Sequence, residues 1–325
     1  MKILITGGAG YIGSTIASAL EDAGHTPVIL DSLITGRAEF TRGRAFYHGD
    51  IADVALLERI FREHPDIYAT IHCAALIVVP DSTARPYEDY TENVSKSLVL
   101  FKTLRDLGCP RVVFSSSASL YDLVPGFMVT EDAPLKPGSP YARTKYMMEM
   151  ILRDFCAAYG MQGIALRYFN PIGADVSGMI GEDPSGIPNI LMPFIAQVAV
   201  GKREKLSVFG DDYDTPDGTA IRDYIHVTDL AAAHVAALKL LMQNHAGGAF
   251  NLGTGPGFSV RQILAAIAAE TGREGSYTIK PRRSGDPAYL VADPAAARQV
   301  LKFKPTHSDL PTIIRTAWAW HKKAH

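Results

Sequence analysis

The stretch KILITGGAGYIG, residues 2–13, decides the fold that we expect. It opens on a short apolar run typical of a buried strand, Lys2–Thr6, and Tyr11–Ala23 then has the apolar spacing of a helix. The glycines between them permit a tight turn and let backbone N–H groups at the helix N-terminus approach a diphosphate. Asp31 ends the next apolar run, where a carboxylate can accept from ribose hydroxyls. The unit therefore predicts a dinucleotide-binding βαβ motif.

The charged residues at and near Asp31 bear on whether the expected dinucleotide is NAD or NADP. A carboxylate at this position repels a 2′-phosphate, so we expect NAD, although Arg37 keeps NADP open as an alternative. Asp50 and Ile51 follow the run Ala45–His48 and are expected at the rim of the adenine pocket, unless Asp50 caps the next helix. The cofactor-binding residues expected from these positions are Gly7, Gly10, Tyr11, Ile12, Gly13, Asp31, Asp50 and Ile51.

Short apolar runs alternate with helical segments through the first half of the chain, which predicts an α/β fold with a doubly wound parallel sheet, a Rossmann-like domain. We expect an NAD-binding domain over residues 1–170 and a smaller α/β substrate domain over 171–325. Residues 219–255 are expected to return to the first sheet as strand, helix and strand. The segments behind these expectations are the strands Pro27–Asp31, Tyr68–Cys73, Arg111–Ser115, Gly163–Tyr168, Arg222–Val227 and Ala249–Gly253, and the helices Tyr87–Leu107, Tyr141–Tyr159 and Thr228–Gln243.

Composition points to a small-molecule partner. The 325 residues are 47% hydrophobic and 20% charged, with a formal net charge of −2, which gives no electrostatic footprint for nucleic acid or an anionic membrane. Three cysteines, widely spaced among apolar neighbours, suit buried thiols in a reducing compartment. No apolar run approaches the ~20 residues of a spanning helix, and metal-ligand spacing is absent. We therefore expect a cytoplasmic protein without a metal.

Three residue types needed for proton transfer fall where the fold would gather them. Tyr141 and Lys145 lie one helical turn apart and project from the same helix face. A nearby ammonium and the positive charge of NAD⁺ would stabilise a phenolate, which makes Tyr141 a candidate general base. Ser115–Ser117 ends a strand at the carboxyl edge of the sheet, where its hydroxyls can reach the same substrate oxygen. The alternative interpretations are that Tyr141 and Lys145 lie on an exposed helix face and that Ser115–Ser117 belongs to a serine-rich loop.

At this point the sequence resembles the extended short-chain dehydrogenase/reductases and, within them, the UDP-glucose 4-epimerase family. The resemblance extends over nearly the whole chain. The motifs that carry it are Gly7–Gly13, Ser115–Tyr121, Ser139–Tyr141 with Lys145, Leu166–Pro171, Gly181–Pro184 through Pro188–Asn189, and Arg222–Val227.

The resemblance implies a role for each matching residue. Tyr141 would be the base, Lys145 its electrostatic partner and ribose ligand, and Ser117 the hydroxyl that orients O4 of the sugar. Asn93 and Tyr168 would support the cofactor site. The substrate ligands would be Asn170, Asn189, Phe209, Arg222, Arg283 and Asp286, in addition to Ser117 and Tyr141. Arginine forks suit diphosphate oxygens, and a carboxylate accepts from ribose hydroxyls.

Four positions depart from the family pattern. Ile77 stands where a lysine near the nicotinamide is common, Asp122 follows Tyr121 in place of glycine, and Ile190 replaces a polar residue. Leu290 falls at the position that gates the sugar pocket, where a small residue would admit a 2-acetamido group. By resemblance, leucine favours UDP-glucose and UDP-galactose alone.

The expected function is reversible 4-epimerisation of a UDP-hexose with recycled NAD. Epimerisation of UDP-N-acetylhexosamine or UDP-glucuronate, nucleotide-sugar dehydration and a non-catalytic NAD-binding role remain alternatives. The helices Tyr87–Leu107 and Tyr141–Tyr159 resemble the dimerising pair of the family, so we expect a homodimer. We expect His72, His226, Trp318 and Trp320 to be packing residues rather than ligands.

Overall fold

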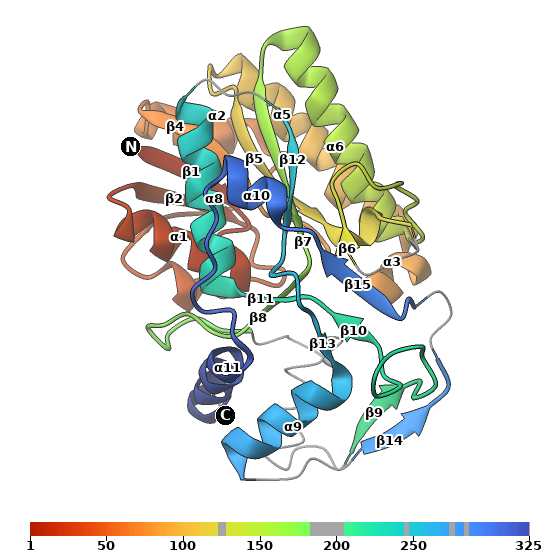
Figure 1. Cartoon of the computed structure of the whole chain (residues 1–325). Helices are drawn as coiled ribbons and strands as arrows, with labels where there is room; N and C mark the ends of the chain where they lie inside the picture. Colours follow the sequence, from red (N-terminus) through yellow and green to blue (C-terminus); the bar gives the residue numbers. More distant parts are fainter. Residues whose placement is uncertain (123–127, 183–204, 244–246, 273–276, 283–285, 325) are drawn as a thin grey trace.

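The computed structural model describes residues 1–122, 128–182, 205–243, 247–272, 277–282 and 286–324. Its larger part is a seven-stranded sheet in the order β12-β7-β5-β4-β1-β2-β3, in which every neighbouring pair is parallel (Figure 1). The strands are β1 (Lys2–Thr6), β2 (Thr26–Asp31), β3 (Ala45–His48), β4 (Ile67–His72), β5 (Arg111–Ser117), β7 (Gln162–Tyr168) and β12 (Ala249–Leu252). The predicted doubly wound sheet is confirmed.

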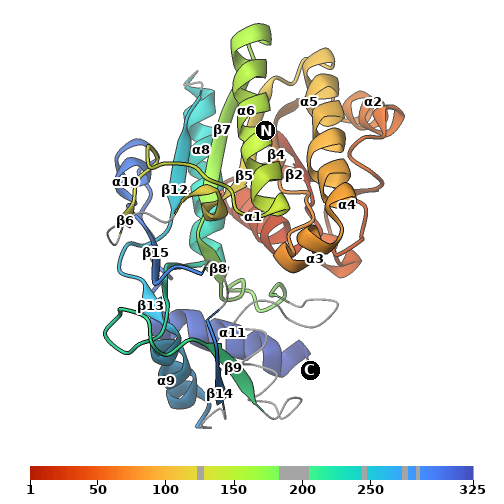
Figure 2. The same cartoon turned by 90° about the vertical axis from the view of Figure 1, so that its right-hand side faces the viewer.

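Helices cover both faces of this sheet and enclose two apolar cores (Figure 2). One core packs α1 (Tyr11–Asp22), α8 (Val227–Met242) and α10 (Ala295–Val300) against the strands. The other packs α2 (Val54–Glu63), α5 (Lys96–Asp106) and α6 (Pro140–Tyr159). Short helices α3 (Val79–Ala84) and α4 (Pro86–Tyr90), and the single turns η1 (Ala38–Thr41) and η3 (Ala118–Leu120), complete this part. All carboxyl ends of the parallel strands meet at one edge, where the site lies.

The smaller part contains short strands in three separate sheets beside α9 (Val260–Thr271) and α11 (Leu310–Ala324). Its core forms where α9 and α11 pack on strand residues such as Leu206 and Tyr224. The sheets are β13 (Phe258–Ser259), β10 (Ile221–Arg222), β15 (Tyr289–Ala292) and β6 (Met128–Val129); β11 (Tyr224–His226) with β8 (Asn170–Ile172); and β14 (Tyr277–Lys280) with β9 (Leu206–Phe209).

The expected single strand Arg222–Val227 is wrong, because the chain breaks it at Asp223. The Asp223 carboxylate is fully buried and accepts from the backbone N–H groups of Thr254, Gly255 and Ala292, at 2.7, 2.9 and 3.1 Å. At the same residue the backbone changes partner strand: the Asp223 N–H donates to the Leu290 carbonyl on β15 at 3.2 Å, and the Asp223 carbonyl accepts from the Asn170 N–H on β8 at 3.0 Å. The two halves, β10 and β11, therefore pair in different small sheets, and of this expected strand–helix–strand unit only β12 joins the large sheet as a strand.

The expected helix Tyr87–Leu107 is interrupted. It consists of α4, a π-helical turn η2 (Thr91–Ser95) and α5. Asn93 lies in the π turn and is 3% exposed; its side chain accepts from the Leu76 N–H at 2.7 Å and donates to the Leu76 carbonyl at 2.9 Å. The π turn places Asn93 where it can clamp the loop that follows β4.

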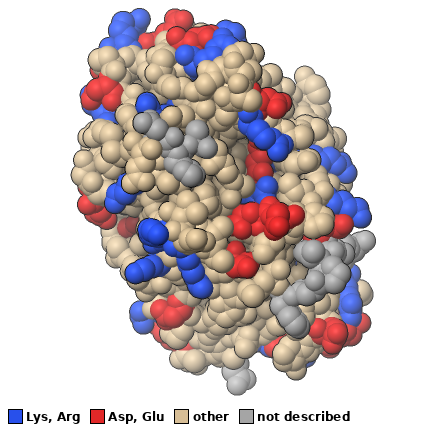
Figure 3. Space-filling view, turned by 45° about the horizontal axis from the view of Figure 1, so that its top comes forward, with Lys and Arg blue, Asp and Glu red and all other residues tan. Residues whose placement is uncertain are grey.

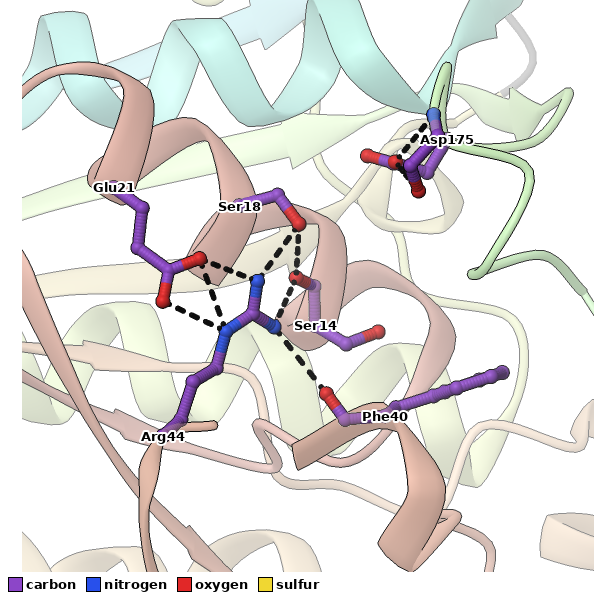
Figure 4. A network of polar contacts seen from close by, with 7 residues as sticks. Ser14, Ser18, Glu21, Phe40, Arg44 and Asp175 are labelled. Carbon is purple, nitrogen blue, oxygen red and sulfur yellow. Dashed lines mark hydrogen bonds and ion pairs between the residues drawn. The ribbon is translucent and has the colours of Figure 1, made fainter. Parts of the chain in front are cut away.

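Arg44 fastens η1 to α1 (Figure 4). Its guanidinium forms an ion pair with Glu21 at 2.7 Å and donates to the Ser18 hydroxyl at 2.9 Å and to the Ser14 and Phe40 carbonyls at 3.2 Å. The Arg44 side chain is 9% exposed, whereas that of Glu21 is 42% exposed, so the guanidinium is buried and its carboxylate partner faces water. Arg44 holds the segment after β2 against the first helix.

Charges of both signs are interspersed over the face drawn in Figure 3. None of the helices in the described part of the chain is long and apolar enough to cross a bilayer. The described cysteines, Cys73, Cys109 and Cys156, are free thiols; Cys109 is buried as expected, whereas Cys73 and Cys156 are only partly buried.

Two expected packing residues are confirmed. His72 is buried and hydrogen-bonds the Thr6 and Ser97 hydroxyls, at 2.7 and 2.9 Å. Trp320 is 8% exposed; its indole N–H donates to the Glu182 carbonyl at 3.1 Å, and its ring meets Phe40 edge-on at 5.9 Å.

His226 is also a packing residue, as expected. Its Nδ1 accepts from the Thr228 N–H at the start of α8, and its Nε2 lies 2.9 Å from the Thr316 hydroxyl on α11. The ring therefore joins the two helices in its neutral form.

Three buried neutral histidines should make folding sensitive to acid. Burial lowers the pKa of His72 to about 3 and the pKa values of His226 and His234 to about 4. Because these pKa values are depressed, their stabilising contribution is present above the unfolded pKa and is lost as pH falls through about 6 to 4. Each histidine should cost about 2 kcal/mol of unfolding free energy at pH 5. Thermal midpoints measured from pH 8 to pH 5 should fall steeply, and less steeply in His234→Gln; equal slopes would contradict this assignment.

Candidate active site

The glycine turn between β1 and α1 is too crowded for side chains. A Cβ added to Gly13 would lie 2.2 Å from the Gly7 carbonyl oxygen, and one added to Gly7 would lie 2.6 Å from the Ala74 nitrogen. Gly7 also has a φ of 72°, which favours glycine. Gly10 precedes α1 and supplies no side-chain cap, so the first N–H groups of the helix face the place of a diphosphate. The turn therefore fits a dinucleotide.

Asp31 lies beside this turn and also holds it. Its carboxylate accepts from the Ala9 N–H at 2.9 Å and from the Leu33 N–H at 2.8 Å, and the residue is 7% exposed. The expected contact with ribose hydroxyls needs only the lone pairs that remain. Arg37 lies nearby and forms a 3.6 Å ion pair with Glu39.

Asp50 does not cap the helix that follows it. That role belongs to Asp53, which accepts from the Leu56 N–H at 3.0 Å. Asp50 pairs with Lys96 on α5 at 2.5 Å, and Ile51 is 8% exposed in the core shared with α2 and α5. Tyr11 donates its hydroxyl to the Gly173 carbonyl at 2.7 Å, while Ile12 packs at the edge of the other core.

The structure brings the expected catalytic trio together at the end of β5. The Ser117 hydroxyl hydrogen-bonds the Ser119 hydroxyl at 2.9 Å and also interacts with the Tyr141 phenol, near the start of α6, which lowers the pKa of that phenol. Lys145 is 3% exposed; its ammonium donates to the Ser115 carbonyl at 2.8 Å and lies 5.9 Å from the Tyr141 ring centre. Ser139 caps α6 and Pro140 begins it, so the helix starts where Tyr141 can meet the sheet edge.

Burial sets the acidity of this trio before any ligand binds. It raises the pKa of Tyr141 to about 12 against the lowering effect of the Ser117 hydrogen bond, so the phenol stays protonated at neutral pH. Burial also lowers the pKa of Lys145 to about 8. An additional positive charge beside the phenol would favour its ionised form.

Sequence reasoning missed two polar residues that face Tyr141. The Ser82 hydroxyl, on α3, accepts from the Tyr141 N–H at 3.2 Å. Asp89, on α4, is 2% exposed, and its charge acts on both Tyr141 and Lys145. Both come from the segment 79–90, and no spacing relates them to α6, so only the fold could identify them.

Tyr168, an expected cofactor-site residue, lies at the end of β7 and contacts α8. It is buried, and its hydroxyl hydrogen-bonds His234 of α8 at 2.5 Å. Its place is at the end of β7, directly beside Ser117 in the parallel register. Its contribution to a cofactor site would therefore come through the shape of the sheet edge.

The expected substrate ligands lie in the smaller part. Arg222 and Asp286 form an ion pair, and Arg222 is opposite Leu290 in the ladder of β10 and β15. Leu290 packs in a small apolar cluster with Tyr121, near the catalytic trio. Further expected ligands are Asn170, whose amide donates to the Asp223 carbonyl at 2.8 Å, and Phe209, at the end of β9. The expected positions Asn189, Ile190 and Arg283 lie outside the described residues.

Of the departures from the family pattern, Ile77 and Asp122 also lie among the described residues. Ile77 is 56% exposed. Asp122 lies 3.7 Å from the Lys136 ammonium.

A model of the NAD dependent epimerase/dehydratase family matches residues 3–253. The chain therefore belongs to that family.

Curated relatives narrow the assignment. The UDP-glucose 4-epimerase of Streptococcus mutans is 45% identical over 323 residues, which cover 99% of this chain and 97% of the relative. The UDP-glucose 4-epimerase of Bacillus subtilis is 44% identical over 98% of this chain and 96% of its own. Within the family, the chain belongs with the UDP-glucose 4-epimerases.

Solved structures agree. A UDP-glucose 4-epimerase of Stenotrophomonas maltophila with bound NAD and formylated UDP-arabinopyranose has a TM-score of 0.96 and 42% identity, covering 100% of this chain and 98% of its own. The UDP-glucose 4-epimerase of Bifidobacterium longum in complex with NAD⁺ and UDP has a TM-score of 0.91 and 38% identity, with coverages of 99% and 98%.

The crowded turn predicts that Gly13→Ala loses cofactor. The new methyl group would collide with backbone atoms, which cannot move aside as a flexible side chain can. We expect a fall of roughly 10-fold or more in NAD retained by the purified protein, because a displaced turn no longer presents its N–H groups. Gly138→Ala is the matched control, since its Cβ would meet open space. Wild-type NAD content and thermal midpoint in Gly13→Ala would refute the argument.

Proposed function

We propose that this protein interconverts UDP-galactose and UDP-glucose through a 4-keto sugar, with NAD held tightly and recycled. The observation that carries the proposal is the Ser117–Tyr141–Lys145 group at the edge of the sheet that also holds the glycine turn. When bound, NAD supplies the oxidising power, taking hydride from C4 of the sugar and returning it to the opposite face.

The residues of this chain would supply proton transfer and orientation. With NAD⁺ bound, its positive charge and the Lys145 ammonium would favour the ionised form of Tyr141, which would then accept the O4 proton and later return it. Ser117 would hydrogen-bond O4 and orient its O–H toward the phenolate. Lys145 is fixed by the Ser115 carbonyl, so its ammonium stays near the phenol throughout. The buried setting strengthens these charge effects, because water is largely excluded.

The smaller part would hold the UDP moiety while the sugar turns over. The proposed ligands are Asn170, Asn189, Phe209, Arg222, Arg283 and Asp286. The Arg222–Asp286 ion pair is already formed, so both side chains are oriented before a nucleotide arrives. The apolar cluster of Leu290 and Tyr121 connects this region to the catalytic trio. A sugar anchored only through its diphosphate could present either face to the cofactor.

The remaining assignments are also proposals. We propose an NAD-binding domain over 1–170, to which part of 219–255 returns, and a substrate domain over 171–325; β12 and α8 in the large-sheet layers support this division. A homodimer through the helices of 87–107 and 141–159 is supported by exposed apolar groups such as Leu98 and Tyr159. Free thiols support a reducing, cytoplasmic setting.

The alternative reactions, substrates and roles have less support. A dehydratase would need an acid and base pair beside Ser117, but Ala118 and Ser119 follow it. Epimerisation of an acetamido or acidic sugar needs room where Leu290 packs. A non-catalytic NAD-binding role would not explain why Ser117, Tyr141 and Lys145 are grouped together.

Replacing Tyr141 by phenylalanine should abolish the base and leave the cofactor in place. Wild-type protein given UDP-galactose without added NAD should form UDP-glucose, and Tyr141→Phe should lower kcat by roughly 10²- to 10⁴-fold. Denatured wild type and variant should release equal amounts of NAD. Tyr146→Phe, on the same helix, is the control. Wild-type turnover in Tyr141→Phe would exclude the tyrosine as base, and an inactive wild type that contains NAD would exclude the proposed function.

Leu290→Ala should widen the substrate range. Removing the side chain opens space in the cluster with Tyr121, so activity on UDP-N-acetylgalactosamine relative to UDP-galactose should rise by roughly 10-fold or more. Leu135→Ala, in the same cluster, is the matched control. An unchanged ratio of kcat/KM values for the two sugars would show that Leu290 does not limit the pocket.

A further inference from the structure

The last three residues of β5 each meet a side chain of α6. The contacting helix residues are spaced four apart, so they form a single row along the face of α6 that lies on the sheet. The contacts are Lys145 Nζ to the Ser115 carbonyl at 2.8 Å, the Ser116 hydroxyl to Glu149 Oε1 at 2.5 Å, and the Ser117 hydroxyl to Tyr141. The first and third belong to the catalytic trio, but the second has no place in the proposed chemistry.

Glu149 is held in turn by Arg167 on β7. Arg167 Nη2 donates to Glu149 Oε2 at 2.7 Å and its Nε donates to Oε1 at 3.0 Å, which is a bidentate pair. Both side chains are deeply buried, at 6% and 10% exposure. Arg167 also lies directly opposite Ser116 in the ladder of β5 and β7. Ser116 is therefore enclosed by an ion pair whose two members come from different elements.

The same guanidinium fixes the chain on the other side of Ser117. Arg167 Nη1 donates to the Tyr121 hydroxyl at 2.7 Å and to the Glu131 carbonyl at 2.9 Å. The Tyr121 hydroxyl donates onward to Asn251 Oδ1 on β12 at 2.6 Å. Ser116 and Tyr121, which lie on either side of Ser117 in the chain, are thus both linked to Arg167, Tyr121 directly and Ser116 through Glu149.

We propose that Glu149 and Arg167 form a positioning unit that sets the Ser117 hydroxyl against Tyr141. The inference rests on the proposed function. The buried charge pair would hold the end of β5 at a fixed depth on α6 through Ser116 and the following chain through Tyr121. The Ser117 hydroxyl between them also contacts the Ser119 hydroxyl at 2.9 Å, so its position would follow that of this short segment. Misplacement of a catalytic group by about 1 Å can cost about 100-fold in rate, so such a support would be visible in kinetics.

The sharpest test removes the link but keeps the ion pair. Ser116→Ala deletes only the hydroxyl that donates to Glu149, and Ser116 is 1% exposed, so it does not present itself to a ligand. We expect kcat for UDP-galactose to fall by about 10-fold or more, with KM and NAD content within about twofold of wild type. The pKa that governs kcat should rise, because the Ser117 hydrogen bond that lowers the pKa of Tyr141 is weakened.

A second variant and a matched control separate positioning from stability. Glu149→Gln keeps the shape and one acceptor while removing the charge, and should lower kcat with the same pattern. Ser18→Ala is the control, because the Ser18 hydroxyl on α1 also contacts a member of an ion pair, Arg44 of the Arg44–Glu21 pair, and none of these residues belongs to the proposed site (Figure 4). That variant should leave kcat and its pH profile unchanged. If Glu149→Gln fails to fold, Ser116→Ala still decides the question.

The possible results are distinct. An active wild type whose kcat and pH profile are unchanged in Ser116→Ala overturns the positioning role, and so does a loss of the same size in Ser18→Ala. A wild type that holds NAD but does not convert UDP-galactose overturns the proposed function, and this inference falls with it. A fall in kcat confined to Ser116→Ala and Glu149→Gln supports both.

Discussion

The hydrogen bond from the Lys145 ammonium to the Ser115 carbonyl is the contact on which the site depends. It joins α6 to the end of β5 in a place that water does not reach, where a donor or acceptor without a partner would cost about 1–3 kcal/mol. Met148 and Leu152 of α6 pack in the apolar core, and the bond adds a polar contact that helps to set where Tyr141 lies relative to Ser117. The Lys145 ammonium also lies 5.1 Å from the Phe114 ring centre and 5.9 Å from the Tyr141 ring centre.

A second constraint joins the two parts of the molecule. The buried Asp223 carboxylate gathers the N–H groups that follow β12 and one from β15, and its backbone carbonyl accepts from Asn170. Burial raises the pKa of this carboxyl, and its hydrogen bonds oppose that effect. The strands that carry Arg222 and Leu290 are therefore anchored to the large sheet through this carboxylate in addition to the apolar cluster that contains Leu290 and Tyr121.

Sequence reasoning succeeded where local pattern and fold agree. The large-sheet strands and the helices α1, α6 and α8 follow from apolar periodicity, and the glycine turn is recognisable because only glycine fits beside Ala74 and Gly7. It failed where a distant partner decides the outcome. Nothing near Asp223 in sequence indicates that it breaks a strand, because its hydrogen-bond donors lie about 30 to 70 residues further along the chain.

The grouping of Ser117, Tyr141 and Lys145 in space was also predictable, since Tyr141 and Lys145 share a helix face and Ser117 ends a central strand. Glu149 continues the same spacing and could have been found by extending the row one turn. Arg167 could not, because its pairing with Glu149 depends on how β7 aligns with β5. Asp89 and Ser82 could not be found from the sequence either, because they meet Tyr141 only after α3 and α4 fold over α6.

The π turn at Thr91–Ser95 has a consequence for how this chain can change in length. A π turn contains one residue more than an α-helical turn, so deletion of a single residue there would produce an unbroken α-helix. Because the wider turn already takes up the extra residue, α4 and α5 on either side would keep nearly the same relative rotation. Asp89 on α4 would stay close to Tyr141, whereas Asn93, which lies in the turn itself, would lose its place against Leu76. A one-residue gap at this turn would therefore spare the flanking helices and chiefly remove the clamp on the loop that follows β4.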